Sequence, residues 1–163
     1  MMLEKRIDLI VYDFDGVMTD NRVCVTEDGK ESVIVNRGDG YAVSEIKRIG
    51  IRQIILSTEE NPVVVQRARK LKIEAIHGVK EKKQVLSGYL EKNQIAPEHV
   101  LYIGNDLNDY ECMLSVGIKG CPADAESEII EICDWVSRKR GGSGVIRDLL
   151  RELIDQSVEG YQV

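Results

Sequence analysis

The sequence lacks paired cysteines, long apolar runs and an amino-terminal segment of the secretory type. Its four cysteines form no CxxC pair and lie far apart, which argues against a disulfide or zinc framework and favours free, mostly buried thiols. No apolar run is long enough to span a bilayer, so we expect no membrane association. The first residues, MMLEKRIDLI, have neither the apolar core nor the cleavage site of a signal peptide, and this predicts a cytoplasmic protein.

An excess of positive charge is also missing. Lys and Arg number 22 against 28 Asp and Glu, and the net charge of −6 argues against a surface for nucleic acid or another polyanion. With 43% hydrophobic and 31% charged residues the composition is that of a globular protein, and 163 residues suffice to bury one core. We therefore predict a single domain over residues 1–163.

Short β-type runs alternate along the chain with segments of helical pattern. The runs show little polar alternation, so the sequence predicts an α/β fold with a doubly wound, Rossmann-like parallel sheet and helices on both of its faces. The expected strands are IDLIVY, IRQIIL, IEAI, VLYI and IKGC. Helices are expected after the capping residues Asp39 and Asn61 and over residues 80–93, 108–116, 126–133 and 145–154.

The segment NRVCVTEDGKESVIVN, residues 21–36, breaks this alternation. Two alternating β-type runs flank EDG, which predicts a β-hairpin after the first strand in place of a strand–helix unit. The apolar residues of such a hairpin would be partly exposed in a monomer, which favours their burial between subunits.

Two aspartates follow the first predicted strand in the stretch VYDFDGVMTD. In an open α/β sheet, ligands bind beyond the carboxyl ends of the strands, and Asp13 and Asp15 occupy that place. Carboxylates this close repel each other unless a cation or a shared proton neutralises them. This suggests a divalent metal, a nucleophile with an acid/base partner, or both. A solvated turn closed by Gly16 is the alternative for this stretch taken alone.

Other predicted strand ends carry complementary groups. Ser57 and Thr58 follow IRQIIL, HGVKEK follows IEAI, and GNDLND follows VLYI, so hydroxyl, ammonium and carboxylate groups are expected at one edge of the sheet. A hydroxyl and a lysine suit the oxygens of a phosphoryl group, and acidic oxygen ligands suit Mg²⁺. The pattern therefore favours phosphoryl chemistry with Mg²⁺.

In this order, DFDGVMTD, Ser57, Lys82 and GNDLND resemble the four motifs of the haloacid dehalogenase superfamily of phosphohydrolases. The hairpin, NRGDGYA, STEENPVV and the closing GGSGVIR are similar to its small capless branch, which hydrolyses sugar-acid phosphates. That branch includes 3-deoxy-octulosonate 8-phosphate phosphatases, nonulosonate 9-phosphate phosphatases and the phosphatase-like domain of some sialic acid cytidylyltransferases. The resemblance implies a Mg²⁺-dependent homotetrameric phosphatase without a cap domain, acting on a phosphorylated sugar acid.

The resemblance also implies roles for individual residues. Asp13 would be the nucleophile that forms an aspartyl-phosphate, and Asp15 would protonate the leaving alcohol and then activate water. Ser57 would donate a hydrogen bond to the phosphoryl oxygens. Lys82 matches the third motif better than the other lysines of GVKEKK and would neutralise the charge of the nucleophile and the phosphoryl group.

The implied metal ligands are Asp13, the carbonyl of Asp15, and either Asn105 or Asp106, with Asp109 in support. The sequence departs from the family here, because much of the family has two successive Asp residues where this chain has Asn105 first. An amide oxygen still ligates Mg²⁺ but supplies one negative charge less. A weakened or lost metal site is the alternative interpretation.

The substrate-binding residues expected from STEENPVVVQRARKLK are Thr58, Glu59, Arg67 and Lys70. At helical spacing Arg67 and Lys70 fall one turn apart, so cations and a carboxylate would border the leaving-group side of the site. The octulosonate branch commonly has an arginine where this chain has Glu59, which favours an acylneuraminate or other nonulosonate 9-phosphate as substrate. Octulosonate 8-phosphate is the second candidate, and an exposed salt-bridge network is the alternative without a substrate role.

Two other functional classes fit parts of the pattern. A phospho-acceptor switch also carries acidic groups, a hydroxyl and a lysine at strand ends, but receiver domains phosphorylate an Asp on a later strand, and IRQIIL ends in Ser57. A non-catalytic oligomerisation or regulatory module is favoured slightly by Asn105, whereas the intact Asp13, Asp15 and Lys82 argue against it. The RKRGG segment, residues 138–142, is either a solvated loop or an anion-binding segment.

Overall fold

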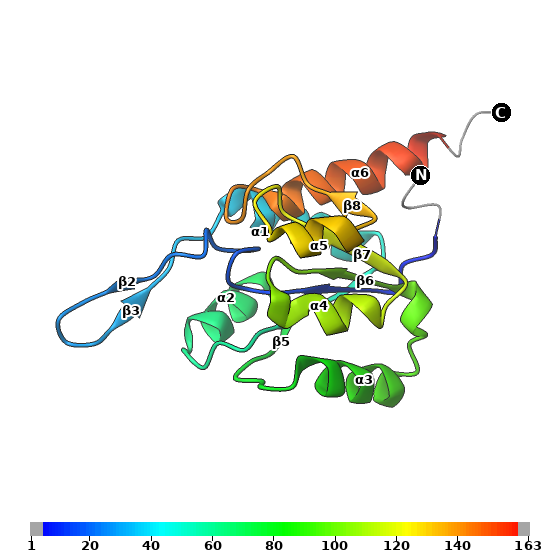
Figure 1. Ribbon diagram of the computed structural model, residues 1–163. Helices are drawn as coiled ribbons and strands as arrows, with labels where there is room; N and C mark the ends of the chain where they lie inside the picture. Colours follow the sequence, from blue (N-terminus) through cyan, green and yellow to red (C-terminus); the bar gives the residue numbers. More distant parts are fainter. Residues whose placement is uncertain (1–4, 160–163) are drawn as a thin grey trace.

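The computed structural model describes residues 5–159, with the side chains of residues 5–154. A six-stranded sheet in the order β5-β4-β1-β6-β7-β8 forms its centre (Figure 1). Every pairing in this sheet is parallel, so the carboxyl ends of its strands meet at one edge. The strands are β1 (Leu9–Tyr12), β4 (Arg52–Leu56), β5 (Glu74–Ile76), β6 (Val100–Ile103), β7 (Ile118–Cys121) and β8 (Trp135–Val136).

Helices cover both faces of the sheet, which confirms the doubly wound fold. One face carries α1 (Arg37–Arg48), α2 (Val63–Leu71) and α6 (Val145–Glu159), and the other carries α3 (Lys82–Asn93), α4 (Leu107–Leu114) and α5 (Ser127–Ile132). A short 3₁₀ turn, Pro97–His99, precedes β6. Alternate residues of β1 enter the two cores, Ile10 and Tyr12 on one face and Leu9 and Val11 on the other. This two-sided burial is why the first strand is apolar without alternation.

The predicted hairpin projects from the body of the molecule (Figure 1). It consists of β2 (Cys24–Val25) and β3 (Glu31–Ser32), which pair antiparallel. Its apolar residues divide into two groups. Val33 and Val35 pack against the core, whereas Val23, Val25 and Ile34 are 51%, 60% and 75% exposed. The described residues contain no cap domain above the sheet edge.

The start of α1 corrects one expectation. The helix begins at Arg37, and the Asn36 side chain caps it by accepting the N–H of Gly38 at 2.7 Å. Asp39 lies within the first turn of the helix, where its Oδ1 accepts the N–H of Arg147 at 2.9 Å. Burial raises the pKa of Asp39 to about 6. Asp39 therefore joins α1 to the start of α6, a role that depends on a tertiary contact.

Strand β8 was not predicted, because a strand of two residues carries no periodicity. The cysteines are free, with Cys112 and Cys121 buried, Cys133 half-buried and Cys24 exposed on the hairpin. Within residues 5–159, no helix combines the length and the apolar character that crossing a membrane requires.

Candidate active site

Asp13 directly follows β1 at the carboxyl edge of the sheet. Its backbone N–H donates to the carbonyl of Ile103 at 2.9 Å and so continues the pairing of β1 with β6. In the turn that follows, Gly16 has a φ of 81°, and a Cβ there would lie 2.1 Å from Nδ2 of Asn105. Glycine therefore lets the turn after β1 touch the loop after β6.

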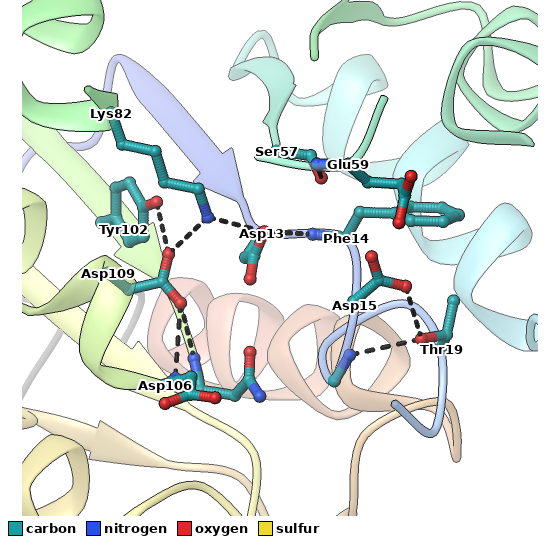
Figure 2. Close-up of polar contacts among 12 residues, drawn as sticks. Asp13, Phe14, Asp15, Thr19, Ser57, Glu59, Lys82, Tyr102, Asp106 and Asp109 are labelled. Atoms are coloured by element: carbon teal, nitrogen blue, oxygen red, sulfur yellow. Dashed lines mark hydrogen bonds and ion pairs between the residues drawn. The ribbon is translucent and has the colours of Figure 1, made fainter. Parts of the chain in front are cut away.

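Buried charges lie behind this turn (Figure 2). The Lys82 ammonium donates to Oδ1 of Asp13 and to Oδ1 of Asp109, each at 2.8 Å. The Tyr102 hydroxyl also donates to Oδ1 of Asp109 at 2.8 Å. Because Lys82, Asp13 and Asp109 are only 3%, 4% and 0% exposed, each charge depends on the others for compensation.

These contacts set the protonation of the lysine. Burial by itself lowers the pKa of Lys82, but the charges of Asp13 and Asp109 outweigh it and raise that pKa. Burial raises the pKa of Asp13, the charge of Asp109 raises it further, and Lys82 opposes both. The structure thus holds an ammonium ion against Asp13, and it brings Lys82 there while Lys80 is exposed and Lys83 pairs with Glu111 on the surface.

Asp15 has different surroundings from Asp13. In Figure 2 its carboxylate points away from Lys82, toward Thr19 and Glu59. Thr19 Oγ1 donates to Oδ1 of Asp15 at 3.4 Å. Burial raises the pKa of Asp15, and the charge of Glu59 raises it further. Paired carboxylates in unlike environments suit a division of labour between a nucleophile and a proton donor.

The loop after β4 supplies a hydroxyl. Ser57 is 1% exposed, and its Oγ accepts the N–H of Glu59 at 3.1 Å. Since the hydroxyl acts as an acceptor there, its proton is available for donation to a ligand. Thr58 beside it is exposed. The Glu59 carboxylate is held in turn by the N–H of Asn61 at 2.6 Å.

The loop after β6 carries Asn105 and Asp106, and the sequence did not distinguish which of the two would ligate a metal. Asp106 is exposed and caps α4, where its Oδ1 accepts the N–H of Leu107 at 2.6 Å. Oδ2 of Asp109 accepts the N–H of Asn105 at 3.0 Å, in addition to the bonds on Oδ1. Asn105 is 7% exposed, and its Oδ1 is buried without a hydrogen-bond partner. Asn105 is therefore better placed than Asp106 to ligate a metal.

An orphaned buried oxygen beside the turn that carries Asp13 and Asp15 fits a hard cation, since Mg²⁺ takes oxygen ligands. The candidate donors are a carboxylate oxygen of Asp13, the carbonyl of Asp15 and Oδ1 of Asn105. Within residues 5–154, no group of three or more His, Cys, Asp or Glu side chains is arranged to hold a metal. A donor set that includes a carbonyl and an amide is compatible with that finding.

The predicted substrate-binding residues lie in two neighbouring cavities. A cavity of about 250 Å³ beside Asp15 includes Glu59 in its lining. Arg67 and Lys70 instead line a cavity of about 620 Å³ between α2 and the hairpin. Arg67 turns toward α1, where its Nη2 donates to the carbonyl of Asn36 at 2.9 Å. The structure therefore does not place Arg67 and Lys70 in the same cavity as Asp15 within one chain, because α2 carries them away from it.

Comparison with known proteins identifies the family. A family model of haloacid dehalogenase-like hydrolases matches residues 42–149. The 3-deoxy-D-manno-octulosonate 8-phosphate phosphatase KdsC of Escherichia coli is 33% identical over 150 residues, which are 91% of this chain and 80% of that protein. The chain belongs to the haloacid dehalogenase-like hydrolases.

Solved structures of haloacid dehalogenase hydrolases superpose well on this fold. A family member from Streptomyces avermitilis has a TM-score of 0.86 at 45% identity, covering 88% of this chain and 82% of that one. The 3-deoxy-D-manno-octulosonate 8-phosphate phosphatase of Moraxella catarrhalis, in complex with magnesium, phosphate and a KDO molecule, has a TM-score of 0.87 at 26% identity. The match covers 96% of this chain and 94% of that one.

This haloacid dehalogenase-like hydrolase is a phosphatase of the capless branch. Membership confirms the fold and the enzyme class expected from the sequence. It argues against the phospho-acceptor switch and the non-catalytic module. Phosphatases of this family depend on a metal ion, in agreement with the buried amide oxygen of Asn105.

Some residues around the haloacid dehalogenase site carry no signal in the sequence. Tyr102 lies in the apolar run VLYI, so nothing in the pattern showed that its hydroxyl would reach Asp109. Glu31 and Arg22 lie on the hairpin segment, and both line the cavity beside Asp15. Only the folding of the hairpin toward the sheet edge brings them there.

Proposed function

We propose that this phosphatase hydrolyses a sugar-acid phosphate through an aspartyl-phosphate on Asp13, with 3-deoxy-D-manno-octulosonate 8-phosphate as its substrate. The observation that carries the chemistry is the 2.8 Å contact of the Lys82 ammonium with Asp13, next to the differently placed Asp15. The relatives support the substrate. Phosphate release from a panel of phosphorylated sugar acids, assayed with and without Mg²⁺, tests both parts.

The reaction follows from the placement of the side chains. An Asp13 carboxylate oxygen attacks phosphorus, the ester P–O bond breaks, and Asp15 gives its proton to the leaving alkoxide. Asp15 then takes a proton from water, the water oxygen attacks phosphorus, and the bond to Asp13 breaks to release phosphate. Lys82 and the Ser57 hydroxyl stabilise the negative charge that the phosphoryl oxygens carry in both steps. Bound Mg²⁺ would supply further charge neutralisation at the same oxygens.

Asn105 provides the first test. Asn105→Asp is expected to lower the Mg²⁺ dissociation constant about 10-fold, because a carboxylate adds a negative charge to the donor set. Asn105→Ala is expected to raise it by at least as much. Calorimetric titration of the free protein with Mg²⁺ measures both without reference to activity. The matched control is Asp106→Asn, which should change little, and a loss confined to this control would assign the metal to Asp106.

The substrate gives the second test. We expect a higher kcat/KM for 3-deoxy-D-manno-octulosonate 8-phosphate than for a nonulosonate 9-phosphate. The reason is that the E. coli relative, which matches 91% of the chain, is a phosphatase of 3-deoxy-D-manno-octulosonate 8-phosphate. This reverses the preference expected from the sequence alone. Initial rates over matched concentrations of the two substrates decide the order.

A nonulosonate 9-phosphate is the second candidate, and Glu59 is the observation that favours it. Its carboxylate borders the cavity beside Asp15 and accepts hydrogen bonds, which suits the additional hydroxyls of a longer sugar. If the longer substrate is turned over better, Glu59→Ala should remove that preference. A site built for hydroxyls discriminates strongly against ligands that leave its polar groups unpaired.

The hairpin supports a homotetramer, which we also propose. Val23, Val25 and Ile34 are each more than half exposed, and burial between subunits would remove this apolar surface from water. Val25→Asp with Ile34→Asp is expected to shift the assembly toward monomer in multi-angle light scattering. Lys30→Gln on the same hairpin is the control that should leave the assembly unchanged. A monomeric, fully active wild-type protein would contradict this proposal.

A further inference from the structure

The segment of residues 138–142, here called the basic loop, connects β8 to α6 and lies against the turn after β1 (Figure 1, orange). The N–H of Gly142 donates to the carbonyl of Val17 at 3.0 Å. A Cβ at Gly141 would lie 2.1 Å from the carbonyl oxygen of Gly16. These backbone contacts fix the basic loop directly beside the turn that carries Asp13 and Asp15.

The cations of the basic loop remain largely in solvent. Arg138 and Arg140 have side chains 80% and 79% exposed, and their ion pairs are long, 3.9 Å to Asp148 and 3.6 Å to Asp124. Lys139 is exposed as well. Exposed ion pairs of this length contribute about 0–1 kcal/mol, so they leave the guanidinium groups free to attract a further anion.

The active site beside the basic loop is rich in negative charge. Asp13, Asp15 and Glu59 crowd the place where a phosphate dianion must arrive, and the whole chain has a net charge of −6. Lys82 is buried and already bonded to two carboxylates. Arg22 lines the cavity beside Asp15 and bound Mg²⁺ would offset part of the negative charge, so further cations at the rim would strengthen the attraction for a phosphate dianion.

We propose that the basic loop captures anionic substrates electrostatically and delivers them to the site, without taking part in the chemical steps. This inference rests on the proposed phosphatase function only in requiring a phosphomonoester, and the substrate carboxylate would add to the attraction. The loop acts at a range of about one Debye length, which is about 8 Å at physiological ionic strength and about 3 Å at 1 M salt.

The test is a variant with Arg138→Gln, Lys139→Gln and Arg140→Gln, in which both loop glycines and the backbone contacts are kept. At low ionic strength its kcat/KM is expected to fall about 10-fold, with kcat changed less than about 2-fold. The difference should nearly vanish at 1 M salt. The matched control removes the same charge at the amino edge of the sheet through Lys47→Gln, Arg52→Gln and Lys72→Gln, and it should retain the wild-type salt dependence.

A variant with Arg138→Lys and Arg140→Lys should restore the wild-type kcat/KM, since only charge is required. The rates are measured with the octulosonate phosphate and with p-nitrophenyl phosphate. If the sugar phosphate is not turned over, the substrate assignment fails while the second substrate still tests the loop. Equal low-salt kcat/KM in the loop variant and wild type, or an equal loss in the control, would overturn the proposal.

Discussion

Asp13→Asn is expected to abolish phosphate release while leaving the fold intact. The amide fills the same volume, and Lys82 keeps its 2.8 Å contact with Asp109, so the buried ammonium retains a charged partner. The amide is a far weaker nucleophile than the carboxylate and supplies no negative charge to a metal. We expect turnover to fall at least about 10³-fold, as is found when a nucleophile is removed.

Phosphate release and circular dichroism should be measured on the same preparation of this variant. The matched control is Asp20→Asn, in the same acidic stretch, because Asp20 pairs with Arg22 at the surface and lies outside the buried network. Turnover of Asp13→Asn within about 10-fold of wild type would remove Asp13 as the nucleophile. The position next to β1 would then have to be explained by metal binding alone.

Lys82→Ala is expected to have the second largest effect. The change leaves Asp13 and Asp109 buried and facing each other without a cation, which costs about 3–5 kcal/mol of folding stability. It also removes the fixed positive charge beside the phosphoryl group, so we expect kcat to fall at least about 100-fold. Chemical denaturation and steady-state kinetics at saturating Mg²⁺ separate the two effects.

The neighbouring lysines are built-in controls for Lys82→Ala. Lys80 is exposed, and the Lys83 side chain is 57% exposed in its pair with Glu111, so Lys80→Ala and Lys83→Ala should retain near wild-type activity and stability. A large fall in kcat in Lys80→Ala with little change in Lys82→Ala would show that Lys80, and not Lys82, is the lysine of GVKEKK that acts in the site.

The local sequence pattern was sufficient to predict the parallel sheet and the edge of that sheet at which the site lies. The apolar runs of β1, β4 and β6 predicted buried parallel strands, and parallel strands bring their carboxyl ends to one edge. Asp13, Ser57 and the GNDLND loop each follow such a strand, so their convergence could be expected from their places in the sequence alone. The prediction that Lys82 belongs to the site also required the family resemblance, because Lys82 lies several residues beyond β5.

The roles of other residues depend on tertiary contacts, which the local sequence pattern does not predict. Asp39 was expected to cap α1, but its carboxylate accepts from Arg147, which lies 108 positions further along the chain. Arg67 has the helical spacing expected of a substrate ligand, yet its guanidinium bonds to the carbonyl of Asn36. Periodicity predicts which side of a helix or strand is buried, but it does not predict which residues distant in the sequence pack against that side.

The fold class, the family and the residue types gathered at the sheet edge could therefore be predicted before the structure was known, because each follows from short segments and their order. Tertiary packing favours Asn105 over Asp106 as the proposed metal ligand, since it leaves the Oδ1 of Asn105 buried without a partner where the loop after β6 packs against Gly16. Tertiary packing likewise decided the place of the basic loop, which the packing of Gly141 against Gly16 sets beside the site. Such close approaches of segments far apart in the chain are a property of the folded molecule.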